Sequence, residues 1–117
     1  MDKRISWNVE ATIKDGQLGA FRDLMEEMVA STCEGEPGAV RYEWFGAGDA
    51  VHILETYADS DAGLAHLGNL GQRFAERLMT LADIKRVCVY GKPTDELRQA
   101  LAGFDAEFFD PLGGFVR

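Results

Sequence analysis

Apolar and polar residues alternate along residues 5–13, which predicts a β-strand with one apolar face. After Asp15-Gly16, apolar residues recur every three or four positions over residues 18–32, which predicts an amphipathic helix. The Gly-Glu-Pro-Gly segment at 35–38 is expected to end this helix, because proline lacks an amide donor and glycine tolerates positive φ angles.

Two more strands are predicted at 39–46 and 51–57, with Gly48-Asp49 between them. This dipeptide is typical of a short hairpin turn, so the two strands are expected to be neighbours and antiparallel. The face of the first strand that we expect to be apolar carries Val40, Tyr42 and Trp44.

A second helix is predicted to start at Ser60, which has an aspartate on either side. Side-chain oxygens accept hydrogen bonds from the free amides there, and negative charge is stabilised at that end of a helix. Gly68 and Gly71 are expected to interrupt the helix, and a further amphipathic run follows at 74–81.

A fourth strand is predicted at 84–90, and Pro93-Thr94 is expected to open a last helix. The element order is then β-α-β-β-α-β. Since crossovers are right-handed, two such halves interleave into a four-stranded antiparallel sheet with helices on one face. This predicts a ferredoxin-like α+β fold in one domain over 1–117, in which 94–117 forms a C-terminal helix and an apolar tail.

The second face of such a sheet has no helices to cover it. Bulky apolar side chains left there would forgo about 25 cal/mol for each Å² in water, so a partner sheet and a homodimer are expected. The tail from Phe104 to Arg117 is too apolar to remain in solvent. It is expected to cross onto a neighbouring subunit or to close over a pocket.

Composition narrows the range of partners. The net charge of −8 disfavours nucleic acid and anionic membranes. Cys33 and Cys88 lack Cys-x-x-Cys spacing, which argues against a disulfide scaffold or a zinc ribbon and favours reduced thiols. No apolar run has the length of a signal peptide or a membrane span, so a cytoplasmic protein is expected.

Three segments resemble the antibiotic biosynthesis monooxygenase family: Gly-Glu-Pro-Gly-Ala-Val-Arg-Tyr-Glu-Trp at 35–44, Val-His-Ile-Leu-Glu-Thr-Tyr-Ala-Asp-Ser at 51–60, and Leu-Ala-His-Leu at 64–67. With their spacing, the resemblance covers about residues 5–91. Members of that family are dimeric α+β barrels, and some oxidise quinols or polycyclic phenols with O2 and neither metal nor flavin. Others degrade haem, isomerise small sugars or have no assigned activity. The resemblance implies a small-molecule pocket, a homodimer and no cofactor.

Haem-degrading relatives carry an asparagine on the first strand, a tryptophan on the second helix and an axial histidine further along it. Asn8 stands at the matching strand position, but His66 and Glu76 occupy the places of the tryptophan and the histidine. Since a carboxylate is a poor axial ligand where a neutral imidazole is needed, haem is not expected.

His66 and Glu55 are the main candidates for chemistry. His66 lies on the apolar side of its predicted helix, and Glu55 shares one strand face with Tyr57. If helices cover that face, a histidine and a carboxylate share a cleft. Burial raises the pKa of a glutamate and a neighbouring carboxylate raises that of a histidine, so either could act as a base near neutral pH. The alternative is a structural histidine that binds a backbone carbonyl or pairs with Glu55.

Other candidates would bind the substrate. Asn8 can donate and accept, which suits a carbonyl or a phenolate oxygen, although it is also an ordinary residue for a solvated strand face. Trp44, Tyr42, Trp7 and Phe74 could form flat walls for an aromatic ligand, or simply belong to the core, and Tyr57 is a further candidate for contact with the ring. His52 has the opposite strand parity from Glu55 and is expected to point away from the cleft.

Three functions remain open. The first is a cofactor-independent monooxygenase that oxidises a small phenol or quinol, because a deprotonated, electron-rich ring can transfer an electron directly to O2. In this hypothesis Glu55 or His66 removes the proton, while Asn8 stabilises the anion. Trp44 and Tyr57 then stack on the ring. The second is a proton-transfer isomerase of a small metabolite that uses His66 and Glu55 without O2. The third is a ligand-binding dimer without catalysis.

Overall fold

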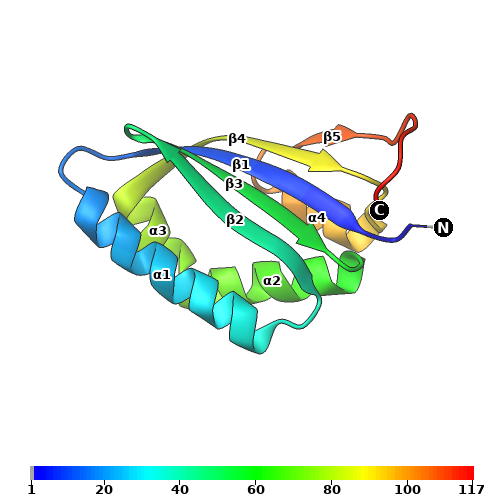
Figure 1. Cartoon of the computed structure of the whole chain (residues 1–117), viewed down its shortest axis with the longest axis horizontal. Helices are drawn as coiled ribbons and strands as arrows, with labels where there is room; N and C mark the ends of the chain where they lie inside the picture. The colour runs from blue at the N-terminus through cyan, green and yellow to red at the C-terminus, as the bar shows by residue number, and fades with distance from the viewer. Residues whose placement is uncertain (1) are drawn as a thin grey trace.

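One mixed sheet with helices on a single face makes up the structure, a computed structural model that describes residues 2–117 (Figure 1). The strand order is β2-β3-β1-β4-β5. The elements are β1 Ile5–Ile13, α1 Leu18–Gly35, β2 Ala39–Ala47, β3 Ala50–Tyr57, α2 Ser60–Arg73, α3 Ala75–Leu81, β4 Ala82–Tyr90, α4 Asp95–Ala102 and β5 Glu107–Phe109. The ferredoxin-like α+β fold is thereby confirmed.

The core fills the space between the sheet and the helices. Alternate residues of β1 and β3 are buried toward the helices, and Trp7 pairs with Glu55 in the register of the two strands. Helix α1 buries one stripe against the sheet, namely Phe21, Leu24, Met28 and Thr32. A second cluster joins Trp7 and Tyr57 to Leu97 and Leu101 of α4.

The sheet has five strands, one more than the sequence predicted. Strand β5 pairs with β4 in parallel, with Cys88 opposite Glu107 and Tyr90 opposite Phe109. Three residues are too few to show the alternation of apolar and polar side chains that marks a strand, so this short edge strand within the apolar tail was not predicted.

Two local predictions are wrong. Helix α2 runs through Gly68 and Gly71 and ends at Phe74, whose φ of −129° leaves the helical range. Each glycine costs about 1 kcal/mol in a helix, less than the packing on both sides of it contributes. Val40 is 58% exposed, because a bulge between Ala39 and Arg41 turns it away from the face that Tyr42 and Trp44 share.

The uncovered face of the sheet is more polar than predicted. Its central strands present Ser6, Asn8, Glu10, Thr12, His52 and Thr56. Ser6 and Thr56 share a hydrogen bond of 2.8 Å, and Glu10 lies 3.7 Å from His52. The apolar or aromatic side chains on this face include Val40, Phe45, Leu54, Tyr90 and Phe109. Bulky apolar residues are therefore present as expected, but they lie among polar residues, so exposed apolar area alone gives only part of the reason for a partner sheet.

The tail divides into three parts. Phe104 lies in the turn after α4 and lines a cavity, and residues 107–109 join the sheet. Beyond them Leu112, Phe115 and Val116 are exposed. Of the tail residues, Phe104 is therefore the one that covers a pocket as predicted. That Leu112, Phe115 and Val116 contact another subunit stays a prediction. Within residues 2–117, no helix combines the length and the apolar character needed to cross a membrane.

Candidate active site

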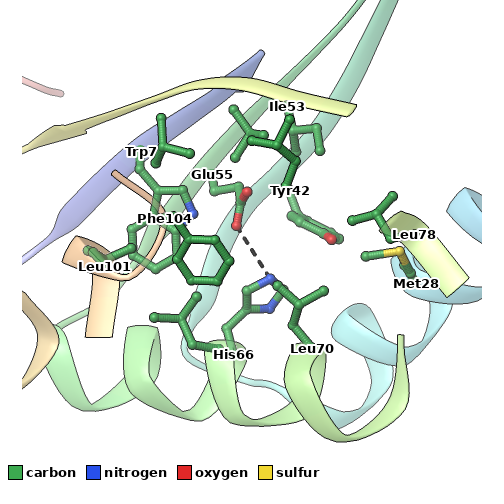
Figure 2. A pocket seen from close by; sticks show the side chains of 14 residues that line it. Trp7, Met28, Tyr42, Ile53, Glu55, His66, Leu70, Leu78, Leu101 and Phe104 are labelled. Atoms are coloured by element: carbon green, nitrogen blue, oxygen red, sulfur yellow. Dashed lines mark ion pairs between the residues drawn. The ribbon is translucent and has the colours of Figure 1, made fainter. Parts of the chain in front are cut away.

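A small apolar cavity lies between the sheet and helices α2 and α4. It has a volume of about 40 Å³. Apolar walls come from both the sheet and the helices, and Figure 2 shows Ile53, Leu70 and Leu101 among them. The carboxyl group of Glu55 and the imidazole of His66 face each other at this cavity (Figure 2). No lysine or arginine is among the side chains that line it within residues 2–117.

Strand parity and helix periodicity bring His66 and Glu55 together. Glu55 is an inward residue of β3, and His66 lies on the buried face of α2. His66 Nε2 lies 3.3 Å from Glu55 Oε1, and each residue is 5% exposed. The hydroxyl of Tyr57 donates a hydrogen bond of 2.6 Å to the same Oε1.

Glu36 is the third titratable member of the site. It lies directly after α1, where Pro37 prevents continuation of the helix, and its side chain is only 7% exposed. Its Oε1 lies 2.9 Å from His66 Nδ1, and its Oε2 accepts a hydrogen bond of 3.2 Å from Asn69. A carboxylate at the negative end of a helix is unfavourable on its own, so its partners His66 and Asn69 offset that cost.

Glu36 was not predicted as a site residue, because residues 35–38 have the pattern of a helix stop. One signal was present: an acidic residue stands where the helix dipole disfavours it. The contact itself joins residues 30 positions apart, which periodicity does not report.

Burial sets the protonation states of the pair. It raises the pKa of Glu55 to about 8, against the opposing effect of the Tyr57 hydroxyl and the Trp7 indole, and the nearby Glu36 charge adds to the rise. Burial also lowers the pKa of His66, although the Glu36 carboxylate opposes this change. Glu55 Oε1 and His66 Nε2 are within ion-pair distance. Because no lysine or arginine among residues 2–117 lines the cavity, burial favours the neutral forms of both side chains. At neutral pH the site therefore holds a protonated Glu55 beside a neutral His66.

The neighbours of His66 also set its tautomer. The Glu36 carboxylate accepts a hydrogen bond from Nδ1–H, which fixes the proton on Nδ1 and leaves Nε2 without a proton and turned toward Glu55 and the cavity. Burial and the adjacent Glu55 charge raise the pKa values of Tyr42 and Tyr57, so both hydroxyls stay protonated. A base and an acid thus lie side by side at one wall of the cavity.

Of the three residues predicted for catalysis, His66 and Glu55 line this cavity and Asn8 does not. Asn8 pairs with Leu54 and Cys88 and projects from the opposite face of the sheet, because its parity along β1 differs from that of Trp7. The structure therefore does not bring Asn8 to the acid and base. His52 also points away from them, as predicted, and is 59% exposed.

The predicted aromatic walls divide between the cavity and its surroundings. Trp7 and Tyr42 line the cavity as predicted, and Phe104, which was not predicted, joins them. Trp44 packs against Phe21 and Tyr42 outside the cavity, and within residues 2–117 its buried indole nitrogen has no hydrogen-bond partner. Tyr57 is fully buried behind Glu55 and stacks on Trp7 with ring centroids 4.6 Å apart. Phe74 lies on the Glu36 side of His66.

The titratable groups do not converge as metal ligands would. Glu36 and Glu55 lie against opposite ring nitrogens of His66, so the three side chains do not point at one position. Over residues 2–117, no group of three His, Cys, Asp or Glu side chains is arranged to hold a metal ion.

Comparison with known proteins places the chain in a family. The family model described as antibiotic biosynthesis monooxygenase matches residues 5–78. The chain belongs to the antibiotic biosynthesis monooxygenase family. A search of curated proteins finds no match.

Solved structures show the same family fold. MupZ from Pseudomonas fluorescens is 29% identical, with a TM-score of 0.88 over 98% of this chain and 95% of MupZ. SnoaB from Streptomyces nogalater, a cofactor-independent oxygenase, is 17% identical, with a TM-score of 0.66 over 79% of this chain and 95% of SnoaB. Rv0793 from Mycobacterium tuberculosis is 20% identical, with a TM-score of 0.66 over 79% of this chain and 96% of its own.

The family model does not reach the C-terminal part of this chain. Its match ends at residue 78, whereas the similarity to MupZ covers 98% of the chain. Helix α4 and the turn after it lie beyond the family model, and they bring Leu101 and Phe104 to the cavity. Part of the cavity wall therefore comes from outside the region that the family model describes.

Proposed function

We propose that this protein is an enzyme that uses His66 as a base and Glu55 as an acid on a small molecule bound in the cavity. One observation carries the proposal: a neutral imidazole and a protonated carboxyl group lie 3.3 Å apart at the wall of an apolar cavity. Burying such groups without a cation costs stability, and hydrophobic residues would pack there at no such cost. Catalysis gives a reason to keep them.

The first candidate reaction is the cofactor-independent oxidation of a small aromatic phenol or quinol by O2. His66 Nε2 removes the proton from the ring hydroxyl, and the resulting anion transfers electrons to O2 directly. For a phenol the products are a quinone and water: one oxygen atom enters the ring, and the other leaves as water with two hydrogens from the substrate. Trp7 and Tyr42 take the place of Trp44 and Tyr57 as walls for the ring. Membership of the family and the fold shared with a cofactor-independent oxygenase support this candidate.

The second candidate is a proton-transfer reaction, such as an isomerisation, that needs no O2. It is favoured by the presence of both an acid and a base, since His66 can remove a proton from one atom while Glu55 delivers one to another. A phenol oxidation needs only the base for its first step.

Activity with and without O2 separates the two candidates. Purified protein is incubated with a panel of phenols and quinols in air, with an oxygen electrode and product analysis, and then in an anaerobic chamber. The first candidate predicts turnover with O2 uptake that stops without air, and the second predicts turnover that continues. His66→Ala is expected to lose about 10²- to 10⁴-fold in rate under either candidate, and Glu55→Gln is expected to lose as much under the second, in which Glu55 delivers a proton. Asn8→Ala, on the other face of the sheet, is expected to keep the activity.

The absence of turnover from the panel in both atmospheres would contradict the first candidate. Turnover that survives His66→Ala would contradict both, because each reaction begins at His66.

We also propose that two copies assemble as a homodimer. The resemblance to a family of dimeric barrels supports this, together with the uncovered sheet face and the exposed apolar side chains at Leu112, Phe115 and Val116. Polar contacts cross that face, where Glu10 lies 3.7 Å from His52 and 3.9 Å from Arg86.

A further inference from the structure

The cavity is too small for the substrates of the proposed reaction. Its volume is about 40 Å³, whereas a cavity that binds benzene has about 150 Å³ and ligand pockets commonly have about 300–1,000 Å³. Any molecule with a ring can reach His66 only if part of the wall moves.

Phe104 is the part of the wall that can move at least cost. Among the lining residues that the structure describes, it alone is classed as exposed, with 40% of its surface in water. The other lining residues lie on the strands or within helices. Phe104 belongs to the turn between α4 and β5, and Figure 2 shows its ring pointing into the cavity, toward Glu55 and His66.

The helix before this turn is firmly held, so movement is confined to the turn. Leu97 of α4 is fully buried and packs closely against Gly63, where an added Cβ would approach it within 3.2 Å. The amide of Thr94 donates a hydrogen bond of 3.0 Å to Ser60. The turn is held by local backbone hydrogen bonds, from Phe104 to Leu101 and from Asp105 to Ala102, each 3.0 Å long, and from Gly103 to Leu101.

We propose that Phe104 is the gate of the cavity and determines which substrates enter. Its ring swings out, the hydroxyl end of the substrate reaches His66, and the apolar body of the substrate takes the space beside Leu101 that the ring leaves. The substrate class is then a phenol that carries an apolar substituent, because the walls around this space are apolar. The identity of the reacting end rests on the proposed function, while the gate rests on the geometry of the wall.

Binding of 4-alkylphenols tests the gate without requiring turnover. Phenol, 4-ethylphenol, 4-butylphenol and 4-hexylphenol are titrated calorimetrically into the wild type and into Phe104→Ala. Phe109→Ala is the matched control, because Phe109 is 43% exposed but packs on Tyr90, away from the cavity. A gate that is mostly closed lowers the apparent affinity by the fraction of open molecules.

Phe104→Ala is expected to bind 4-butylphenol about tenfold more tightly than the wild type, whereas Phe109→Ala stays within about twofold. In Phe104→Ala, affinity should rise by up to about fourfold for each added CH2 that is buried. Phe104→Leu is expected to change affinity in the same direction by less, and Phe104→Trp in the opposite direction.

Three results would each overturn the gate. They are binding by Phe104→Ala that is no tighter than that of the wild type, equal changes in affinity in Phe104→Ala and Phe109→Ala, and no binding of any alkylphenol. The same ligands are titrated into His66→Ala with and without the Phe104→Ala change, because the removal of the Phe104 ring should tighten binding in that background too. Gated binding without turnover in either atmosphere would refute the proposed function and leave the gate standing. Turnover with no dependence on Phe104 would do the reverse.

Discussion

Replacing Glu55 with glutamine should stabilise the protein, and increasingly so as the pH rises. The glutamine side chain has nearly the shape of the protonated acid and carries no charge. Because Tyr57 and His66 Nε2 both face Oε1 of Glu55, the glutamine amide can keep one of these two contacts at that position, which is a smaller loss than the burial of a titratable carboxyl group. In the wild type, burial raises the pKa of Glu55 from its ordinary value of 4.5 to about 8. Between these values the unfolded chain is ionised while the folded chain holds a proton, so the free energy of unfolding falls as the pH rises.

The size of the effect follows from about 1.36 kcal/mol for each pKa unit. At pH 5 the shift destabilises the wild type by about 1 kcal/mol, at pH 7 by about 3 kcal/mol and at pH 9 by about 5 kcal/mol. Glu55→Gln removes this penalty, so its advantage over the wild type should grow across that range. For a domain of ordinary stability, about 5–15 kcal/mol in total, such a gain is large.

Urea unfolding of both proteins at pH 5, 7 and 9, followed by tryptophan fluorescence, measures the difference. Glu26→Gln on the exposed side of α1 is the control, expected to stay within about 0.5 kcal/mol of the wild type. The opposite sign would refute the reasoning. If Glu55 were a carboxylate paired with a charged His66, its replacement would break a buried ion pair and destabilise by about 3–5 kcal/mol.

Three further predictions concern activity and assembly. The pH profile of kcat/KM should fall above about pH 8, where Glu55 loses its proton, and its acidic limb should lie below pH 6.5, the ordinary pKa of histidine, because burial lowers the pKa of His66. Glu36→Gln should reduce kcat by about 10²- to 10⁴-fold, because its amide can donate to Nδ1 and so favour the wrong tautomer; an unchanged kcat would show that Glu36 does not position His66. Multi-angle light scattering should give twice the mass of one chain, and a monomer at micromolar concentration would contradict the proposed homodimer.

Periodicity predicted most of the fold because the elements have long, regular patterns. The alternation over residues 5–13 and the helical spacing over 18–32 each place one apolar face against the core. Val40 was misplaced because a bulge shifts the parity of a strand, and the sequence contains no local signal for it. Strand β5 is held by its pairing with β4, a contact between distant residues rather than a pattern of its own.

Regular patterns also predicted two members of the candidate site, Glu55 and His66, but not Glu36 or Phe104. Parity and helix periodicity were enough to bring Glu55 and His66 to one side of the sheet. The prediction that Asn8 joins them did not apply the same parity along β1, which places Asn8 on the opposite face from Trp7. Glu36 could not be found in this way, because its position depends on how the end of α1 docks on α2. Phe104 was likewise hidden in a tail whose turn follows no period.

The central claim is that His66 is a neutral base with its proton on Nδ1 beside a protonated Glu55. A ¹⁵N NMR spectrum of the two His66 ring nitrogens at pH 7 tests it most directly, with His66→Ala to assign the signals. We expect two widely separated resonances, one from a protonated Nδ1 and one from an unprotonated Nε2. Two similar resonances, both bearing protons, would show an imidazolium ion and contradict the claim.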